Sequence, residues 1–124
     1  MHTLQQEMDL FREEVPEFVS TDMVNIESGL SIGGATIDDD FDASVASACY
    51  AEVVKLNRKA LDLLGLGTHS TEDILITTAT LNILVRMLGT NYCHVLAITR
   101  KGNLGLARAI MKKYESVLLD VVGD

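Results

Sequence analysis

The first helical pattern occupies residues 3–15. Four apolar residues recur at the spacing of one helix face: Leu4, Met8, Phe11 and Val15. Thr3 stands immediately before the pattern, where a hydroxyl side chain can cap the first turn. Pro16 disfavours helical geometry at the residue before it. The pattern therefore predicts an amphipathic helix that ends at Pro16.

An extended pattern follows. Val24 and Ile26 alternate with other residue types, and the pattern resumes beyond a turn with Leu30, Ile32 and Ile37. Gly29 can adopt the positive φ that a tight turn needs. Gly33 and Gly34 weaken the second strand, which favours a short edge strand or a bulge. We therefore predict a hairpin of two strands.

The longest helical pattern runs from Ala43 to Leu64. Asp42 can cap its start, and Gly65 and Gly67 can end it. On a helical wheel, apolar residues fill an arc of roughly 180° that only Asn57 interrupts. Its members are Val45, Leu63, Leu56, Cys49, Ala60, Val53, Ala46, Leu64, Tyr50, Leu61 and Val54.

This arc is wider than the roughly 100° that a helix needs to cover one sheet. The surplus predicts a second packing surface on a partner, although alanine and cysteine are also small enough to be exposed at little cost. Val45 and Leu56 lie at one end of the arc, and Val54 and Leu61 lie at the other. One end should face the chain's own sheet and the other a second chain, and the periodicity does not say which.

Three short segments rich in Ile, Val, Leu and Thr come next, at residues 72–80, 81–89 and 92–100. A hairpin turn at Gly89–Asn91 and a tighter turn between Thr80 and Asn82 would join them. Consecutive strands without intervening helices predict an antiparallel meander. Apolar residues on both faces of each strand imply helices on both faces of the sheet.

The last helical pattern carries one apolar face: Leu104, Ala107, Ile110, Met111, Tyr114, Val117, Leu118 and Val121. The turn before it contains Gly102 and Gly105, whose spacing matches neither a dinucleotide fingerprint nor a P-loop. We expect Gly102 to let the chain reverse, Asn103 to cap the helix and Gly105 to permit close packing of the helix on the sheet.

The element order is therefore α-β-β-α-β-β-β-α, an α+β fold in a single domain over residues 1–124. Apolar residues make up 48% of the chain, which is a globular composition. No apolar run approaches the ~18 residues of a membrane span, and the acidic start lacks a signal pattern. The sequence thus favours a soluble cytoplasmic protein with no membrane partner.

Charge and candidate ligands exclude several kinds of site. A net charge of −8 argues against a nucleic-acid partner, which would require a basic surface. The acidic run Asp38–Asp42 lacks the spacing of a calcium loop. Cys49 and Cys93 form no metal-binding pair with each other or with a histidine, so we expect two reduced, buried thiols. We predict neither metal nor cofactor.

Two stretches carry a family resemblance. "LAITRKGNLGLARAIMKK" (residues 96–113) resembles the last strand, turn and helix of the roadblock family, the dynein light chain and its bacterial relatives. The match is most specific at Asn103-Leu104-Gly105. "LGTHSTEDILITTATLNILVRMLGTNYCHVLAIT" (residues 66–99) resembles the family's central hairpins. The first hairpin departs from the family because Asp22, Asn25 and Gly33-Gly34 make it more polar and looser.

The resemblance implies a five-stranded antiparallel sheet of order 2-1-5-4-3. The long middle helix would cover one face, and the two terminal helices the other. Family members pair through the middle helix and the neighbouring edge strand and act as non-catalytic dimeric platforms. Bacterial and archaeal members act on small Ras-like GTPases, whereas eukaryotic members adapt motor cargo or scaffold signalling GTPases.

No catalytic constellation is evident in the sequence. Ser44, Ser47, Ser70 and Ser116 lack a nucleophile elbow. A GTPase activator can insert a catalytic arginine, an arginine finger, into its partner's active site. The sequence singles out none of the five arginines for this role: Arg12, Arg58, Arg86, Arg100 and Arg108. We therefore predict that the chain is not an enzyme.

We predict a homodimeric module that binds and regulates or scaffolds a small Ras-like GTPase. The expected interface residues are Val45, Ala46, Cys49, Tyr50, Val53, Val54, Asn57, Leu61, Ile74 and Ile76. The alternatives are an adaptor for another signalling partner and a small-molecule-binding sensor. A sensor requires a pocket with convergent polar groups, for which Asn82, Arg86 and His94 are the inward candidates.

Overall fold

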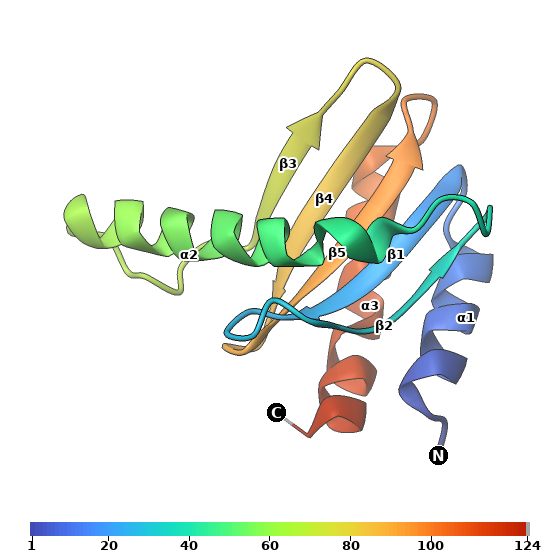
Figure 1. The fold of residues 1–124 in the computed structure, drawn as a ribbon, viewed down its shortest axis with the longest axis horizontal. Helices are drawn as coiled ribbons and strands as arrows, with labels where there is room; N and C mark the ends of the chain where they lie inside the picture. Colours follow the sequence, from blue (N-terminus) through green and yellow to red (C-terminus); the bar gives the residue numbers. More distant parts are fainter. Residues whose placement is uncertain (124) are drawn as a thin grey trace.

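The computed structural model describes residues 1–123, in which one sheet lies between two layers of helix (Figure 1). The elements in chain order are α1 (Leu4–Glu14), β1 (Phe18–Asn25), β2 (Ser31–Thr36), the 3₁₀ turn η1 (Ala43–Ala46), α2 (Ser47–Leu63), β3 (Asp73–Thr77), β4 (Leu81–Leu88), β5 (Tyr92–Thr99) and α3 (Leu104–Val122). The predicted α+β element order is confirmed.

The sheet has the strand order β2-β1-β5-β4-β3, and neighbouring strands are antiparallel. The order 2-1-5-4-3 is therefore confirmed. Helix α2 crosses one face, and α1 and α3 lie on the other (Figure 1). Strands β2 and β3 form the two edges of the sheet, and β3 lies on the side toward which α2 runs.

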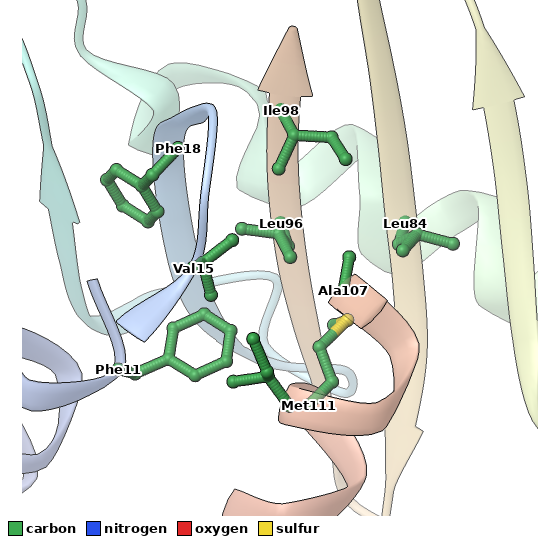
Figure 2. Packing of buried hydrophobic residues seen from close by; sticks show 9 residues of the cluster. Phe11, Val15, Phe18, Leu84, Leu96, Ile98, Ala107 and Met111 are labelled. Atoms are coloured by element: carbon green, nitrogen blue, oxygen red, sulfur yellow. The ribbon is translucent and has the colours of Figure 1, made fainter. Parts of the chain in front are cut away.

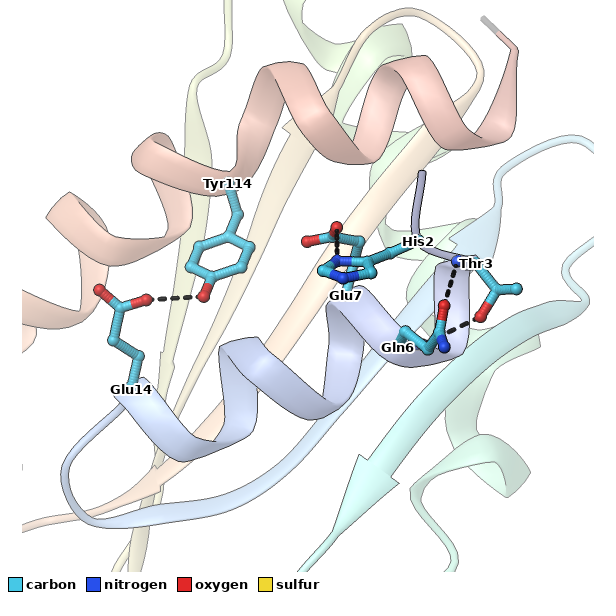
Figure 3. Close-up of polar contacts among 6 residues, drawn as sticks. All are labelled: His2, Thr3, Gln6, Glu7, Glu14 and Tyr114. Atoms are coloured by element: carbon cyan, nitrogen blue, oxygen red, sulfur yellow. Dashed lines mark hydrogen bonds and ion pairs between the residues drawn. The ribbon is translucent and has the colours of Figure 1, made fainter.

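Helix α1 begins and ends where the sequence predicts. Thr3 and Gln6 form a capping box, in which the Gln6 backbone N–H donates to Thr3 Oγ1 at 3.2 Å and the Thr3 N–H donates to Gln6 Oε1 at 2.8 Å (Figure 3). Val15 is extended, immediately before Pro16. Tyr114 of α3 donates to Glu14 Oε2 at 2.6 Å and ties the end of α1 to the neighbouring helix.

Both faces of the sheet carry an apolar core. Beneath α1 and α3, one cluster joins Phe11, Val15, Phe18, Leu84, Leu96, Ile98, Ala107, Ile110 and Met111 (Figure 2). A second cluster on that face joins Met8, Met23, Leu88 and Leu118. Beneath α2, the core consists of Val24, Ile26, Ala51, Val54, Val85, Cys93 and Val95. Helices on both faces account for the two-sided apolar pattern of the strands.

The first hairpin has the expected edge strand. Gly29 in its turn has φ +73°, and β2 lies at the edge of the sheet, with a register shift in β1 between Met23 and Val24. A Cβ at Gly34 would lie 2.6 Å from the Thr21 carbonyl oxygen. Glycine is therefore required at this position of β2, where any Cβ would overlap the backbone of β1.

Two predicted boundaries differ from the structure. Residues 43–46 form η1 rather than the first turn of α2, although Asp42 does cap it by accepting from the Ser44 N–H at 3.0 Å. The turn before β4 centres on Thr78–Thr80, because the Thr78 N–H donates to the Leu81 carbonyl at 2.8 Å. Boundaries shift in this way because local hydrogen bonds, rather than periodicity, set the ends of elements.

The expected role of Gly105 was wrong. Gly105 is exposed, and a Cβ there would meet only Asn103 Oδ1 within 4 Å, at 3.3 Å. The close approach occurs instead at Gly102, where a Cβ would lie 2.7 Å from Ile98 Cδ1. Asn103 caps α3 as predicted, accepting from the Leu106 N–H at 2.9 Å.

The two thiols differ in burial. Cys93 is buried, as expected, whereas Cys49 is exposed on α2. The expectation that both are buried was therefore wrong for Cys49. Among residues 1–123, no helix combines the length and apolar character that crossing a membrane requires.

Candidate interaction surface

Helix α2 is held against the sheet by a narrow strip of its surface. Ser47, Ala51 and Val54 are buried, and Ser47 Oγ donates to the Gly29 carbonyl at 3.0 Å. These residues share one side of the helix at the 3.6-residue period. Figure 1 shows the second half of α2 continuing beyond β3, so this half has no strand beneath it.

The outer apolar face of α2 and of the preceding η1 turn is open to solvent. We call the exposed residues Val45, Cys49, Val53, Leu56, Ala60 and Leu63 the α2 stripe. Three of its large side chains are strongly exposed: Val45 (80%), Leu56 (64%) and Leu63 (78%). Leu64 and Leu66 extend the apolar surface past the end of the helix, at 72% and 55% exposure. A contiguous exposed apolar surface is typical of an interaction site.

Polar contacts fix the orientation of α2. Asn57 Nδ2 donates to Thr71 Oγ1 at 2.8 Å, and Arg58 Nη2 donates to the Thr90 carbonyl at 2.9 Å. Lys55 Nζ donates to the Glu27 carbonyl at 3.2 Å. These contacts join α2 to the loops around the sheet and leave the α2 stripe facing outward.

The edge strand β3 adds a second feature on the same side of the molecule. It pairs with β4 alone among the strands of residues 1–123. Ile74 and Ile76 are half-buried beneath α2, and Leu75 on the opposite face is 39% exposed. The strand "DILIT" contains no lysine or proline, the residues that commonly block edge pairing. Its outer backbone is therefore available to another chain.

The ten predicted interface residues fall into three groups. Val45, Cys49 and Val53 are exposed, and six are half-buried along the flank of α2 and β3: Ala46, Tyr50, Asn57, Leu61, Ile74 and Ile76. Val54 is 0% exposed and belongs to the core beneath α2, so it cannot contact a partner. The prediction for Val54 is corrected on this ground.

The predicted set omits the most exposed leucines. Leu56 and Leu63 were part of the apolar arc but were left out of the interface, and they are prominent members of the α2 stripe. The sequence did indicate their exposure, because both leucines lie beside the polar half of the helix. A large aliphatic residue next to Lys59 and Glu52 lies far from the buried strip of the helix.

All five arginines already contact their own chain. Arg108 Nε donates to Asp73 Oδ2 at 3.0 Å, and Arg86 lies 3.7 Å from the same carboxylate. Arg100 Nη1 donates to the Thr78 carbonyl at 2.6 Å, and Arg12 lies 6.0 Å from the ring centroid of Phe18. Arg58 is held as described above. The arrangement favours structural roles for these side chains.

His94 has a structural setting beneath α1. Thr21 Oγ1 donates to the Val95 carbonyl at 2.8 Å, so the same oxygen accepts from the Nε2–H of His94, also at 2.8 Å. The His94 ring lies 4.6 Å from that of Phe11. Burial lowers the pKa of His94 to about 3, and the charge of Arg86 adds to this effect. His94 is therefore neutral at physiological pH.

The first hairpin holds a buried carboxyl group that the sequence analysis noted only as a departure from the family. Asp22 is 3% exposed, and its Oδ1 accepts from Ser31 Oγ. Its Oδ2 is buried without a hydrogen-bond partner. Burial raises the Asp22 pKa to about 6; the Ser31 hydrogen bond opposes the rise and the Asp42 carboxylate adds to it. The sequence feature that could have identified this group is an acidic residue inside the otherwise uncharged strand "FVSTDMVN".

Comparison with known proteins shows the fold. Myxococcus xanthus MglB has a TM-score of 0.85 and 17% identity, covering 97% of this chain and 87% of MglB. A Roadblock/LC7 domain from Streptomyces avermitilis has a TM-score of 0.86 and 16% identity, covering 99% and 100%. A structure of MglB with a tetrameric arrangement has a TM-score of 0.82 and 12% identity, covering 95% and 86%.

No protein-family model matches the chain, and no curated protein matches it in sequence. The structural likeness nevertheless extends over nearly the whole of residues 1–123. The chain has the roadblock fold, as the resemblance at Asn103-Leu104-Gly105 predicted.

Proposed function

We propose that this chain is a non-catalytic homodimeric module that binds and regulates or scaffolds a small Ras-like GTPase. The observation that carries the proposal is the α2 stripe beside the open edge of β3. A second copy related by a two-fold axis could cover both features at once, because such an interface uses the same patch on each copy.

The free energy available from the α2 stripe is large enough for association. Burying a leucine or valine side chain stabilises a complex by roughly 1.5–3 kcal/mol. Val45, Leu56 and Leu63 are each more than half exposed in the single chain. Two copies would contribute six such side chains, which supports a stable dimer after the cost of association is met.

The GTPase partner rests on the fold and on the engaged arginines. The roadblock fold is shared with MglB, and the family resemblance implies partners of the Ras-like class. The chain's own arginines contact groups within it, which favours binding or scaffolding over donation of a catalytic arginine. The turn at Gly102 and Gly105 has no P-loop spacing, so GTP would be held by the partner alone.

Light scattering on a sizing column tests the dimer. At micromolar concentration we expect twice the 13.5 kDa of one chain. Leu56→Asp should give a folded monomer, because it places a charge in the α2 stripe. Lys59→Asp is the matched control, since it introduces aspartate at an exposed position on the polar half of α2 and should remain dimeric. A monomeric wild-type chain would contradict the proposal.

Binding assays with a purified small Ras-like GTPase of the source organism test the partner. The GTPase is loaded with GDP or with a non-hydrolysable GTP analogue, and binding is followed by calorimetry. We expect binding that distinguishes the two nucleotide states and weakens in Leu56→Asp but not in Lys59→Asp. GTP binding or turnover by the chain alone, or equal failure with every such GTPase tested, would overturn the assignment.

A further inference from the structure

Two cavities meet at Asp22. The larger, of about 340 Å³, lies between the β1–β2 hairpin and residues 36–44, and the smaller, of about 150 Å³, lies beneath η1 and the start of α2. Asp22, Phe41, Asp42 and Ala43 line both. A water molecule occupies about 30 Å³ of the liquid, so the larger cavity has room for a small organic group.

The Asp22 carboxyl group has unused hydrogen-bonding capacity inside this space. The residue is only 3% exposed, and its Oδ2 has no hydrogen-bond partner and is shielded from solvent. Among residues 1–123, no lysine, arginine or histidine forms an ion pair with it. A buried carboxylate without a cation is costly, so it marks a place where a bound group could supply the missing partner.

The surroundings favour a positively charged group. Asp39 and Asp42 line the larger cavity with Asp22, and neither cavity is lined by a basic residue. Phe41 lines both cavities, and the residue is 42% exposed, so its aromatic side chain is available to a cation at the opening. Complementary charge would thus draw a cation to this hairpin.

The free oxygen selects the kind of cation. Ser31 already donates to Oδ1, and Oδ2 is the oxygen without a partner, so a bidentate guanidinium pair would have to share Oδ1 with Ser31. An ammonium group is a compact point charge with three rotatable donors, so it can direct one N–H at Oδ2 without a second carboxylate oxygen. A metal ion is less suited, because no three His, Cys, Asp or Glu side chains of the described residues are placed to hold one.

We propose that the cavity at Asp22 binds the ammonium group of an organic amine, with Asp22 Oδ2 as its buried acceptor and Phe41 at the opening. The ammonium comes either from a free alkylamine or from a lysine side chain of a protein partner. The smaller cavity shares Val45 with the α2 stripe. The proposal itself rests on Asp22, and amine binding tests it separately from dimer formation and from a GTPase.

The test is an NMR titration of the full chain with n-butylammonium chloride at pH 7.5. We expect saturable shifts at the amides of Asp22, Gly34 and Phe41, with a dissociation constant of about 1 mM, as befits a ligand of five heavy atoms. Neutral n-butanol should cause no saturable shift at these amides. Absence of saturation with n-butylammonium would overturn the proposal.

Two variants separate the site from general charge attraction. Asp22→Asn keeps the side-chain shape and should weaken n-butylammonium binding at least tenfold. Asp40→Asn removes the same charge from the neighbouring loop, and Asp40 lines neither cavity, so its binding should stay within twofold of wild type. Equal weakening in both variants would contradict the proposal.

A pH series on the wild-type chain gives an independent test, whether or not Asp22→Asn folds. Binding should weaken between pH 7.5 and pH 5, as Asp22 takes up its proton near pH 6. The other titratable groups that face Asp22 are Asp39, Asp42, Tyr50 and Cys93. Tyr50 and Cys93 have raised pKa values and stay neutral throughout this range. Affinity that is constant over the series would overturn the assignment to Asp22.

The source of the ammonium group follows from a second probe, Nα-acetyl-lysine methylamide. If it binds within a few fold of n-butylammonium, the cavity admits a lysine side chain and a protein partner is the source. If n-butylammonium alone saturates the same amides, the source is a free amine. Either result supports the site, and failure of both probes overturns it.

Discussion

Val54 and Leu56 stand two positions apart on α2, yet Val54 is 0% exposed and Leu56 is 64% exposed. Residues two positions apart in an α-helix are separated by about 200° around its axis, so these two side chains point to opposite sides of α2. The Val54 end of the apolar arc therefore faces the chain's own sheet. The Leu56 end is the surface that we assign to a second copy.

Aspartate should have opposite consequences at these two positions. Val54→Asp buries an unpaired charge in the core beneath α2, which we expect to destabilise the fold by about 3–5 kcal/mol. A domain of this size is stable by about 5–15 kcal/mol, so most of the stability is lost. Leu56→Asp should remain folded and lose only the part of the stability that dimer formation contributes. Circular dichroism with urea unfolding distinguishes them, and equal midpoints would contradict the assigned orientation of α2.

Gly34→Ala should destabilise the chain by about 1–3 kcal/mol. The new Cβ would lie 2.6 Å from the Thr21 carbonyl oxygen, so the β1–β2 pairing must shift. Gly67→Ala is the control, because its Cβ would meet Ser70 Cβ at an ordinary 3.7 Å. Urea unfolding should place the control within about 0.5 kcal/mol of wild type. A Gly34→Ala variant as stable as Gly67→Ala would refute the close approach.

The Asp22 carboxyl group should reduce stability as the pH rises. Its pKa is about 6 in the folded chain, above the ordinary aspartate pKa of 3.8, so the folded state keeps the proton to higher pH than the unfolded state does. The free energy of unfolding therefore falls between about pH 4 and pH 6. Relative to wild type, Asp22→Asn should gain about 3 kcal/mol over this range and no more above it. Urea unfolding at several pH values measures the difference, and a constant difference would count against it.

His94 should act in the opposite direction. Its pKa is about 3 in the folded chain, below the ordinary histidine pKa of 6.5, so the unfolded state takes up the proton first on acidification. Stability contributed by neutral His94 is present above about pH 6.5 and is lost as the pH falls toward 3. Compared with His94→Gln, the wild-type chain should lose about 3 kcal/mol between pH 6.5 and pH 4. Parallel pH profiles of the two proteins would show that His94 is not buried as a neutral ring.

The opposing titrations of Asp22 and His94 have a joint consequence. Between about pH 4 and pH 6 the two effects offset each other in the wild-type chain. The wild-type profile alone therefore conceals both groups. The differences between each variant and wild type are the informative measurements.

Local rules in the sequence were sufficient for much of the fold. The spacing of Leu4, Met8 and Phe11 and the cap at Thr3 predicted α1 because periodicity and capping are properties of one segment. Gly29 and Asn103 marked a turn and a helix start for the same reason. The width of the apolar arc on α2 likewise predicted a second apolar surface without knowledge of the sheet.

What depends on contacts between distant segments was decided by the tertiary structure. Periodicity gives the angles of residues around α2 relative to one another, but it does not say which side of the helix faces the sheet. Only the position of the sheet showed that Val54 is buried and Leu56 is exposed. Gly105 and Gly102 are equivalent as residues, and packing against Ile98 distinguishes them. Asp22 became a candidate binding group only when β2 and residues 36–44 closed around it, because burial and an unpaired oxygen are properties of its surroundings and not of aspartate itself.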